Sequence, residues 1–129
     1  MEKRSFDRVT VDVPAMVIFT LADNSNVECD GVLHNISEGG VQIKLEKEDY
    51  DAIAPKLKIG DVIGFKAVDV YQVFSDKRED IVQGNVEVIW VSEADREIAI
   101  GGKLNYVSSD YLSYVKNKKL STFIIKPKM

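Results

Sequence analysis

Apolar and polar residues alternate along most of this chain, which is the period of a β-strand with one buried face. The clearest case is the stretch 41–46, where Val41, Ile43 and Leu45 are separated by polar residues. Pro14 interrupts the first alternating stretch, which predicts an edge or a bulge at that point. The pattern predicts strands over residues 9–21, 27–34, 41–46, 62–68, 70–74, 82–90 and 98–106.

The segments between these strands have the composition of turns or of a short helix. Residues 46–59 carry apolar side chains at helical spacing, but Pro55 limits a helix there to one or two turns. Residues 75–80 predict a solvated loop, and residues 92–97 predict a turn. Gly101 and Gly102 fall inside the last strand, which indicates a bend or the close approach of another backbone or a ligand.

A closing helix is expected after the last strand. Ser108 or Ser109 can cap its start, and Tyr111, Leu112 and Val115 are expected to form its apolar stripe. Positive charge suits the C-terminal end of a helix dipole, where we expect three lysines: Lys116, Lys118 and Lys119. Residues 120–129 follow without a clear assignment.

Several short strands followed by one helix, without alternation of strands and helices, indicate an all-β protein. We therefore predict an antiparallel β-barrel of six to seven strands with a C-terminal α-helix. The expected division is a flexible N-terminal arm over residues 1–8, the barrel over 9–107, and the helix and tail over 108–129. A length of 129 residues is that of one domain.

Charge and composition narrow the class of protein. A net charge of −4 argues against a nucleic-acid polymer as partner, because such proteins usually carry a strongly basic face. The sequence has neither an apolar run that could cross a bilayer nor the apolar core of a secretory signal, so we expect a cytoplasmic protein without membrane insertion. One cysteine, Cys29, and one histidine, His34, exclude an internal disulfide and argue against a metal site.

Catalytic chemistry finds little support in the sequence. It contains neither a Gly-x-Ser-x-Gly nucleophile elbow nor a Walker-type phosphate loop. His34 lies at a strand end without placed partners, so an ordinary strand histidine is the simpler interpretation. Cys29 shares a face with Val27 and Leu33, which favours a buried structural thiol. We predict no catalytic residue and conclude that the chain is not an enzyme.

Two polar features remain, and both suit an anionic ligand. The turn between the second and third predicted strands carries Asn35, Ser37 and two adjacent glycines. Arg4 and Arg8 precede the first strand, and guanidinium groups bind phosphate and the O6/N7 edge of guanine in bidentate fashion. Each feature alone is also found in ordinary hairpin turns and solvated termini.

Taken together, the two features resemble the signature of the PilZ domain family. Arg4-x-x-x-Arg8 is followed by Asn35-x-Ser37-x-x-Gly40, which match the family motifs Arg-x-x-x-Arg and Asp/Asn-x-Ser-x-x-Gly in the family's order. Both motifs are complete, and the second lies between two predicted strands.

Later parts of the chain extend this resemblance to about residues 3–107. Residues 84–90, which end in Trp90, look like the family's glycine-rich strand, and Ile100-Gly101 looks like its next glycine strand. The chain departs from the family pattern at Leu104, where a large aromatic residue is common, and at Gly102, which is an extra glycine.

The resemblance implies a PilZ-type β-barrel that binds the bacterial second messenger cyclic di-GMP and needs no cofactor besides this ligand. It implies that Arg4 and Arg8 clasp guanine and phosphate groups. Asn35 and Ser37 would bind a guanine edge and nearby phosphate or ribose groups, while Gly40 would allow the geometry of the turn. Further contacts are expected from two neighbours of these motifs: Lys3 and Gly39. Ligand binding is expected to order the arm and to signal to a protein partner.

Two other functions stay open at this point. A PilZ-like barrel can act as a protein-interaction module that does not bind nucleotide. A small barrel can also bind single-stranded nucleic acid, although the acidic charge and the lack of a strand face that combines aromatic and basic residues argue against it. The residues do not determine the partner, its pathway, or whether one ligand or a stacked pair binds.

Overall fold

A computed structural model describes residues 8–21, 23–52 and 57–125 of the chain. Within these residues the elements are β1 (Val9–Thr20), β2 (Asn26–Ile36), β3 (Gly40–Glu46), α1 (Lys47–Asp51), β4 (Val62–Val73), β5 (Asp76–Glu93), β6 (Glu97–Val107) and α2 (Tyr111–Ile125).

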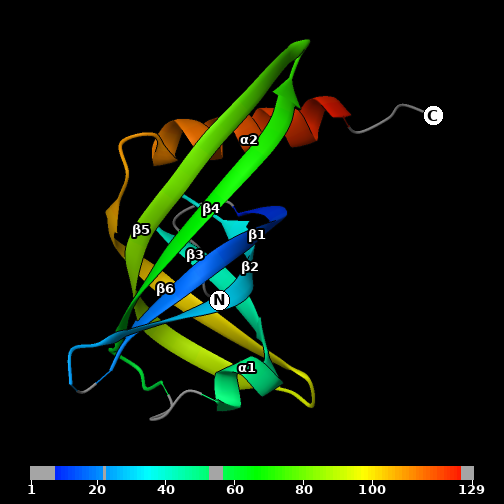
Figure 1. The fold of residues 1–129 in the computed structure, drawn as a ribbon. Coiled ribbons are helices and arrows are strands. Elements are labelled where there is room, and N and C mark those ends of the chain that lie inside the picture. The colour runs from blue at the N-terminus through cyan, green and yellow to red at the C-terminus, as the bar shows by residue number, and fades with distance from the viewer. Residues whose placement is uncertain (1–7, 22, 53–56, 126–129) are drawn as a thin grey trace, which may run out of the picture.

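The six strands form a closed barrel in the order β1-β2-β3-β6-β5-β4, and every neighbouring pair is antiparallel (Figure 1). Residues 15–18 of β1 pair with residues 64–67 of β4 and close the ring. The predicted all-β fold, an antiparallel barrel followed by a C-terminal helix, is confirmed with six strands.

Pro14 explains why the pairing that closes the barrel is short. The last pair is Ala15 with Ala67, and continuing the register would place Pro14 beside Val68. A proline has no N–H to donate to a neighbouring strand. The β1–β4 ladder therefore stops at Ala15, the residue that follows Pro14. Beyond Ala67, β4 continues without pairing to β1.

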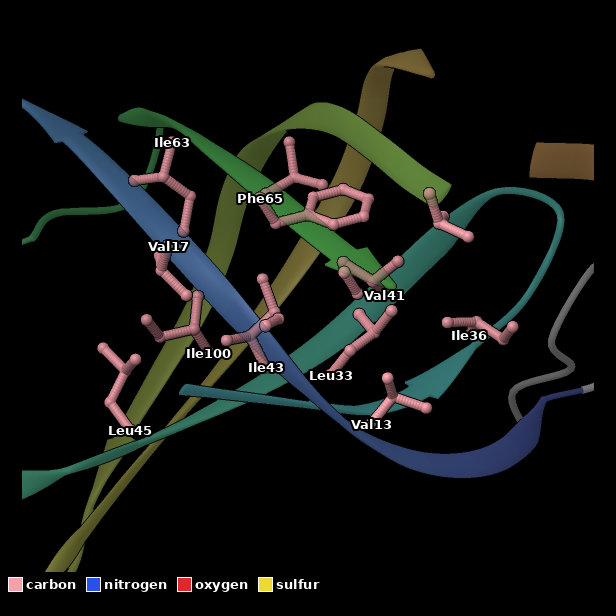
Figure 2. Packing of buried hydrophobic residues seen from close by; sticks show 14 of the residues in the cluster. Val13, Val17, Leu33, Ile36, Val41, Ile43, Leu45, Ile63, Phe65 and Ile100 are labelled. Atoms are coloured by element: carbon pink, nitrogen blue, oxygen red, sulfur yellow. The ribbon is translucent and has the colours of Figure 1, made fainter. Parts of the chain in front are cut away.

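The buried core follows the strand period that the sequence predicts. Apolar side chains from different strands point toward one another inside the barrel (Figure 2). Those that the figure labels are Val13, Val17, Leu33, Ile36, Val41, Ile43, Leu45, Ile63, Phe65 and Ile100. Each is at most 5% exposed, so one face of every contributing strand is removed from water, which is the main stabilising term of such a fold.

The paired glycines of β6 serve close side-chain packing. A Cβ atom added to Gly101 would lie 2.2 Å from the ring of Trp90, and one added to Gly102 would lie 2.7 Å from the Cβ of Val86. The sequence predicts a bend or the close approach of a backbone or a ligand at these positions, whereas the groups that lie nearest are side chains of β5.

One prediction for β6 is wrong. The alternation from Ile98 places Tyr106 on the buried face, yet Tyr106 is 61% exposed. The β5–β6 register shifts between Asn85 and Val86, which pair with Tyr106 and Leu104 respectively. This bulge inserts one residue into β6 and turns Tyr106 toward solvent.

The predicted break at residue 69 and the predicted loop over 75–80 are also wrong. β4 runs without interruption to Val73, and β5 begins at Asp76 after a two-residue turn. Phe74 in that turn has a φ of 58°, a left-handed conformation that is uncommon for phenylalanine. The result is a long hairpin, whose far end extends past α2 in Figure 1. We call its outer part, residues 68–73 of β4 and 76–82 of β5, the outer hairpin.

Helix α2 differs from the prediction in its buried face and in its length. Tyr111, Tyr114 and Val115 are fully buried, whereas Leu112 is 57% exposed. The helix continues to Ile125, so the three lysines expected at its C-terminal end lie in its middle. The hydroxyl of Ser108 accepts a hydrogen bond from the backbone N–H of Gln83 at 3.4 Å, while its carbonyl accepts one from Tyr111.

Helix α1 lies at the opposite end of the barrel from α2 (Figure 1). Its five residues confirm the short helix expected before Pro55, although Pro55 itself lies outside the described residues. The buried Tyr50 accepts a hydrogen bond from the N–H of Leu57 at 2.9 Å, which ties Leu57 to this helix. In the described part of the chain, neither helix has the length and apolar character needed to cross a membrane.

Candidate functional site

The candidate site is built around the turn of residues 37–40, which joins β2 to β3. The last pair of the two strands is Ile36 with Val41. Beyond it, the N–H of Ser37 donates to the carbonyl of Gly40 at 2.9 Å and closes the turn. The predicted hairpin is therefore present, with its polar turn at the end of the barrel where α2 begins.

The hydroxyl of Ser37 organises this turn. It accepts hydrogen bonds from the N–H groups of Gly39 at 3.3 Å and Gly40 at 3.1 Å, and it lies 3.3 Å from the carbonyl oxygen of Gly40. The residue is 6% exposed. A serine at this position therefore has a structural role, and its predicted contact with a ligand stays a prediction.

Gly39 and Gly40 connect the turn to β6. The carbonyl of Gly39 accepts a hydrogen bond from the N–H of Leu104 at 3.0 Å. A Cβ atom on Gly40 would lie only 2.7 Å from the carbonyl oxygen of Gly102. Gly40 is thus required by the close approach of a neighbouring strand, and this also gives the extra glycine of β6 a place in the site.

Asn35 is held in one orientation and has an unused acceptor. Its Nδ2 donates to Oε1 of Gln42 on β3 at 2.8 Å. Its Oδ1 is buried and has no hydrogen-bond partner among the described residues. A buried acceptor without a partner costs free energy in the folded protein, so this oxygen calls for a partner beyond the described residues, such as a water or a ligand.

Arg8 is brought to the same end of the barrel. It is exposed and directly precedes β1, whose first pair is Val9 with Ile36. Continuing this register by one residue places Arg8 level with Ser37. The other predicted basic residues, Lys3 and Arg4, lie outside the described residues, so their part in the site and the arm over residues 1–8 stay predictions.

A contact between Asp12 and His34 lies beside the site, and the sequence did not reveal it. Nδ1 of His34 is 2.5 Å from Oδ1 of Asp12. Asp12 has a φ of 48° and lies in a bulge, where the β1–β2 register shifts between Thr10 and Val13. The contact thus joins the bulged residue of β1 to the paired strand β2.

The cysteine that was considered for catalysis is buried. Cys29 is 8% exposed, and burial raises the pKa of its thiol, which keeps it protonated and unreactive. Among the described residues, no group of three His, Cys, Asp or Glu side chains could hold a metal ion.

Two residues of α2 contact the turn. The hydroxyl of Tyr111 donates to the carbonyl of Ser37 at 2.6 Å, and Nζ of Lys119 lies 3.0 Å from Oε2 of Glu38. The hydrogen bond from Lys119 holds the pKa of the Glu38 carboxyl below its usual value. These partners are separated by 74 and 81 residues, so the sequence contains no local signal for them.

The same helix also holds the outer hairpin. The buried carboxylate of Asp69 accepts a hydrogen bond from the hydroxyl of Tyr114 at 2.9 Å and pairs with Nζ of Lys118 at 3.0 Å. Lys118 also lies 4.5 Å from the ring centre of Tyr71, whose ring meets that of Tyr114 edge to face at 5.7 Å. Helix α2 therefore connects the turn to the outer hairpin.

Solved structures share this fold at low sequence identity. The inhibitor of motility MotI/DgrA of Bacillus subtilis aligns with a TM-score of 0.67 and 8% identity over 98% of this chain and 55% of its own. The PilZ domain of Escherichia coli YcgR with c-di-GMP aligns with a TM-score of 0.63 and 18% identity, covering 95% of both chains. YcgR in complex with c-di-GMP gives 0.60 and 17%, over 95% of this chain and 47% of its own.

This chain thus spans about half the length of MotI/DgrA and of the larger YcgR chain. No curated protein matches it. The model of the PilZ domain family matches residues 2–116, which include both motifs and all six strands. The chain belongs to the PilZ domain family.

Proposed function

We propose that this protein is a cyclic di-GMP receptor that changes conformation when the ligand binds and signals to a protein partner. The observation that carries the proposal is the buried Oδ1 of Asn35, which has no hydrogen-bond partner among the described residues. It lies in the same turn region as Ser37 and next to the start of β1 with Arg8. PilZ domains are binding and adaptor domains rather than enzymes, and a cytoplasmic location is part of the proposal.

The chemistry of the ligand suits these groups. Guanine presents N–H donors on one edge and the O6 and N7 acceptors on another. The free Oδ1 of Asn35 can accept from such a donor, and the guanidinium of Arg8 can bind O6/N7 or a phosphate. We expect Arg4, and in addition Lys3, to complete the basic side of the site, with Ser37 and Gly39 offering further contacts from the turn.

Signalling is proposed to pass through α2. A ligand that contacts the turn changes the environment of Ser37 and Glu38, which are the two residues that α2 holds through Tyr111 and Lys119. At the same time, residues 1–8 are expected to pack against the ligand. A partner then reads the altered surface, since a ligand shifts an equilibrium only through different contacts in the two states.

Titration calorimetry with cyclic di-GMP tests the proposal, with GTP and a short single-stranded RNA as control ligands. We expect binding of cyclic di-GMP alone. Arg8→Ala should weaken it by about 1.5–3 kcal/mol, since a charge-assisted hydrogen bond is lost. Asn35→Ala should weaken it as well. Arg96→Ala is the matched control, because Arg96 is exposed in the turn between β5 and β6 near α1.

The same measurement can overturn the proposal. Absence of heat with all three ligands would favour a protein-interaction module, and binding of the RNA alone would favour a nucleic-acid-binding barrel. Hydrogen exchange of residues 1–8 with and without ligand tests the conformational step, and unchanged protection would remove it.

A further inference from the structure

The outward face of β1, β2 and β4 carries one row of three side chains with a charge at each end. Met16 on β1 pairs with Asp30 on β2 and with Lys66 on β4. Directly paired residues share a face of the sheet, so Asp30, Met16 and Lys66 stand side by side on the outside of the barrel. All three are exposed, Met16 by 38%.

Apolar side chains continue this row onto the outer hairpin. Val68 is 48% exposed, Val70 is 52% exposed, and Ile81, which pairs with Val68, is 51% exposed. The opposite face of the same strands is covered by α2 through Asp69 and Tyr71. Met16, Val68, Val70 and Ile81 therefore form an exposed apolar patch, which we call the outer face. A cluster of this kind on a protein surface commonly marks an interaction site.

Lys66 and Asp30 have no ion-pair partner among the described residues. Two strand spacings, about 10 Å in total, separate them. A hollow lies between them, lined by Pro14, Ala15, Met16, Asp30, Lys66 and Val68. The row thus presents a negative group, an apolar centre and a positive group to the outside.

We propose that the outer face binds a second copy of this chain about a two-fold axis parallel to β1. An axis through Met16 exchanges the two ends of the row. Lys66 of each copy then faces Asp30 of the other, and the two Met16 side chains meet at the centre. A two-fold interface requires such self-complementarity, since the same patch contributes from both copies.

The distribution of charge favours a second copy over a partner of a single charge sign. Glu28 extends the acidic side on β2, and Lys77 extends the basic side on the outer hairpin. Each side has an exception: Glu79 opposite Val70 on the basic side, and Lys44 opposite Val32 on the acidic side, where Lys44 pairs with Glu97 at 3.5 Å. A uniformly acidic or basic partner would be repelled by one side. The patch is small compared with a standard interface of about 800 Å² per partner, so we expect a weak dimer. The inference does not depend on the proposed ligand.

Sedimentation equilibrium of the full chain at low salt, from micromolar to millimolar concentration, tests the proposal. We expect a monomer–dimer equilibrium. Lys66→Asp and Asp30→Lys should each weaken dimerisation at least about tenfold, since each replaces two attractive pairs by two repulsive ones. The double variant should restore the wild-type equilibrium. Lys103→Asp, an exposed charge reversal on β6, is the matched control and should leave it unchanged.

Three results would overturn the proposal. They are a wild-type chain that stays monomeric at millimolar concentration, single variants that dimerise as well as the wild type, and a double variant that is folded but not restored. Circular dichroism of every variant establishes that it is folded, so a loss of dimer in a folded single variant followed by its return in the double variant can come only from the pairing of these two residues.

Discussion

Helix α2 holds two regions of this molecule with the same pair of residue types. A tyrosine and a lysine, Tyr111 and Lys119, contact the turn of residues 37–40. Another tyrosine and lysine, Tyr114 and Lys118, contact Asp69 of the outer hairpin. The two attachments nevertheless differ in their surroundings.

The outer hairpin is attached through a shielded carboxylate, and the turn is attached through exposed or neutral groups. The side chains of Lys118 and Asp69 are 14% and 12% exposed, whereas those of Lys119 and Glu38 are 33% and 36% exposed. Exposed ion pairs contribute little to stability, because water and salt screen them. Helix α2 is therefore anchored mainly on the outer hairpin, and its hold on the turn is the weaker of the two.

Removing the shielded carboxylate should have the largest effect. Asp69→Ala leaves Lys118 and the hydroxyl of Tyr114 without their partner, and we expect the free energy of unfolding to fall by about 2–4 kcal/mol. Urea unfolding measures this loss. Asp69→Asn keeps an acceptor for Tyr114 and should cost less. A loss below about 1 kcal/mol in Asp69→Ala would contradict the anchoring role.

The hydrogen bond of Tyr114 should rank second. Tyr114→Phe removes a bond to a carboxylate without changing the shape of the ring, and we expect a loss of about 1.5–3 kcal/mol in the free energy of unfolding. The same unfolding experiment applies. Since this bond is remote from the turn, the affinity for cyclic di-GMP should stay at its wild-type value. A changed affinity would show that the attachment of α2 to the outer hairpin also affects the ligand site.

Tyr111→Phe should have a smaller effect on stability. Its hydroxyl donates to a neutral backbone carbonyl, so we expect a loss of about 0.5–1.5 kcal/mol. Unlike Tyr114→Phe, this change touches the turn directly and should alter the affinity for cyclic di-GMP, as calorimetry can measure. If Tyr111→Phe left the affinity unchanged, α2 would not be coupled to the ligand site.

The smallest effect is expected for the pair of Glu38 and Lys119. The pKa of Glu38 is lowered in the folded chain by the hydrogen bond from Lys119. The contribution is therefore present above the ordinary value of 4.5 and disappears as the pH falls through the lower folded value. We expect less than about 1 kcal/mol, because both side chains are about one-third exposed. Unfolding of wild type and Glu38→Gln between neutral and acidic pH should show curves that converge toward low pH; parallel curves would disprove the assignment.

Much of the barrel could be predicted because strand alternation is a local property. Val41, Ile43 and Leu45 show one buried face in six residues, and no distant partner is needed to recognise it. The two motifs were likewise local, and the structure brings Arg8 to the turn that contains Asn35 because β1 pairs with β2.

The errors fell where a distant contact decided the outcome. A charged residue at position 69 predicts a break between two strands. It lies inside one strand because its partners, Tyr114 and Lys118, come from a helix more than forty residues later. The turn at Phe74 carries no residue that favours a left-handed conformation, so the sequence predicts a loop for the charged residues that follow it. Leu112 and Tyr114 could each belong to an apolar stripe of the helix. In the folded protein Tyr114 is buried against the barrel and Leu112 is exposed.

Local sequence was enough to predict most strands of a small barrel and, through two short motifs, the resemblance to the PilZ family and a set of candidate site residues. Other features follow only from the folded chain: α2 joins the turn to the outer hairpin, Asp30 and Lys66 flank Met16 on one face, and the Oδ1 of Asn35 is buried without a partner among the described residues. The difference between the two groups of features lies in how far apart the interacting residues are in the sequence. Strand alternation arises between neighbouring residues, whereas these contacts join groups that meet only when the barrel closes.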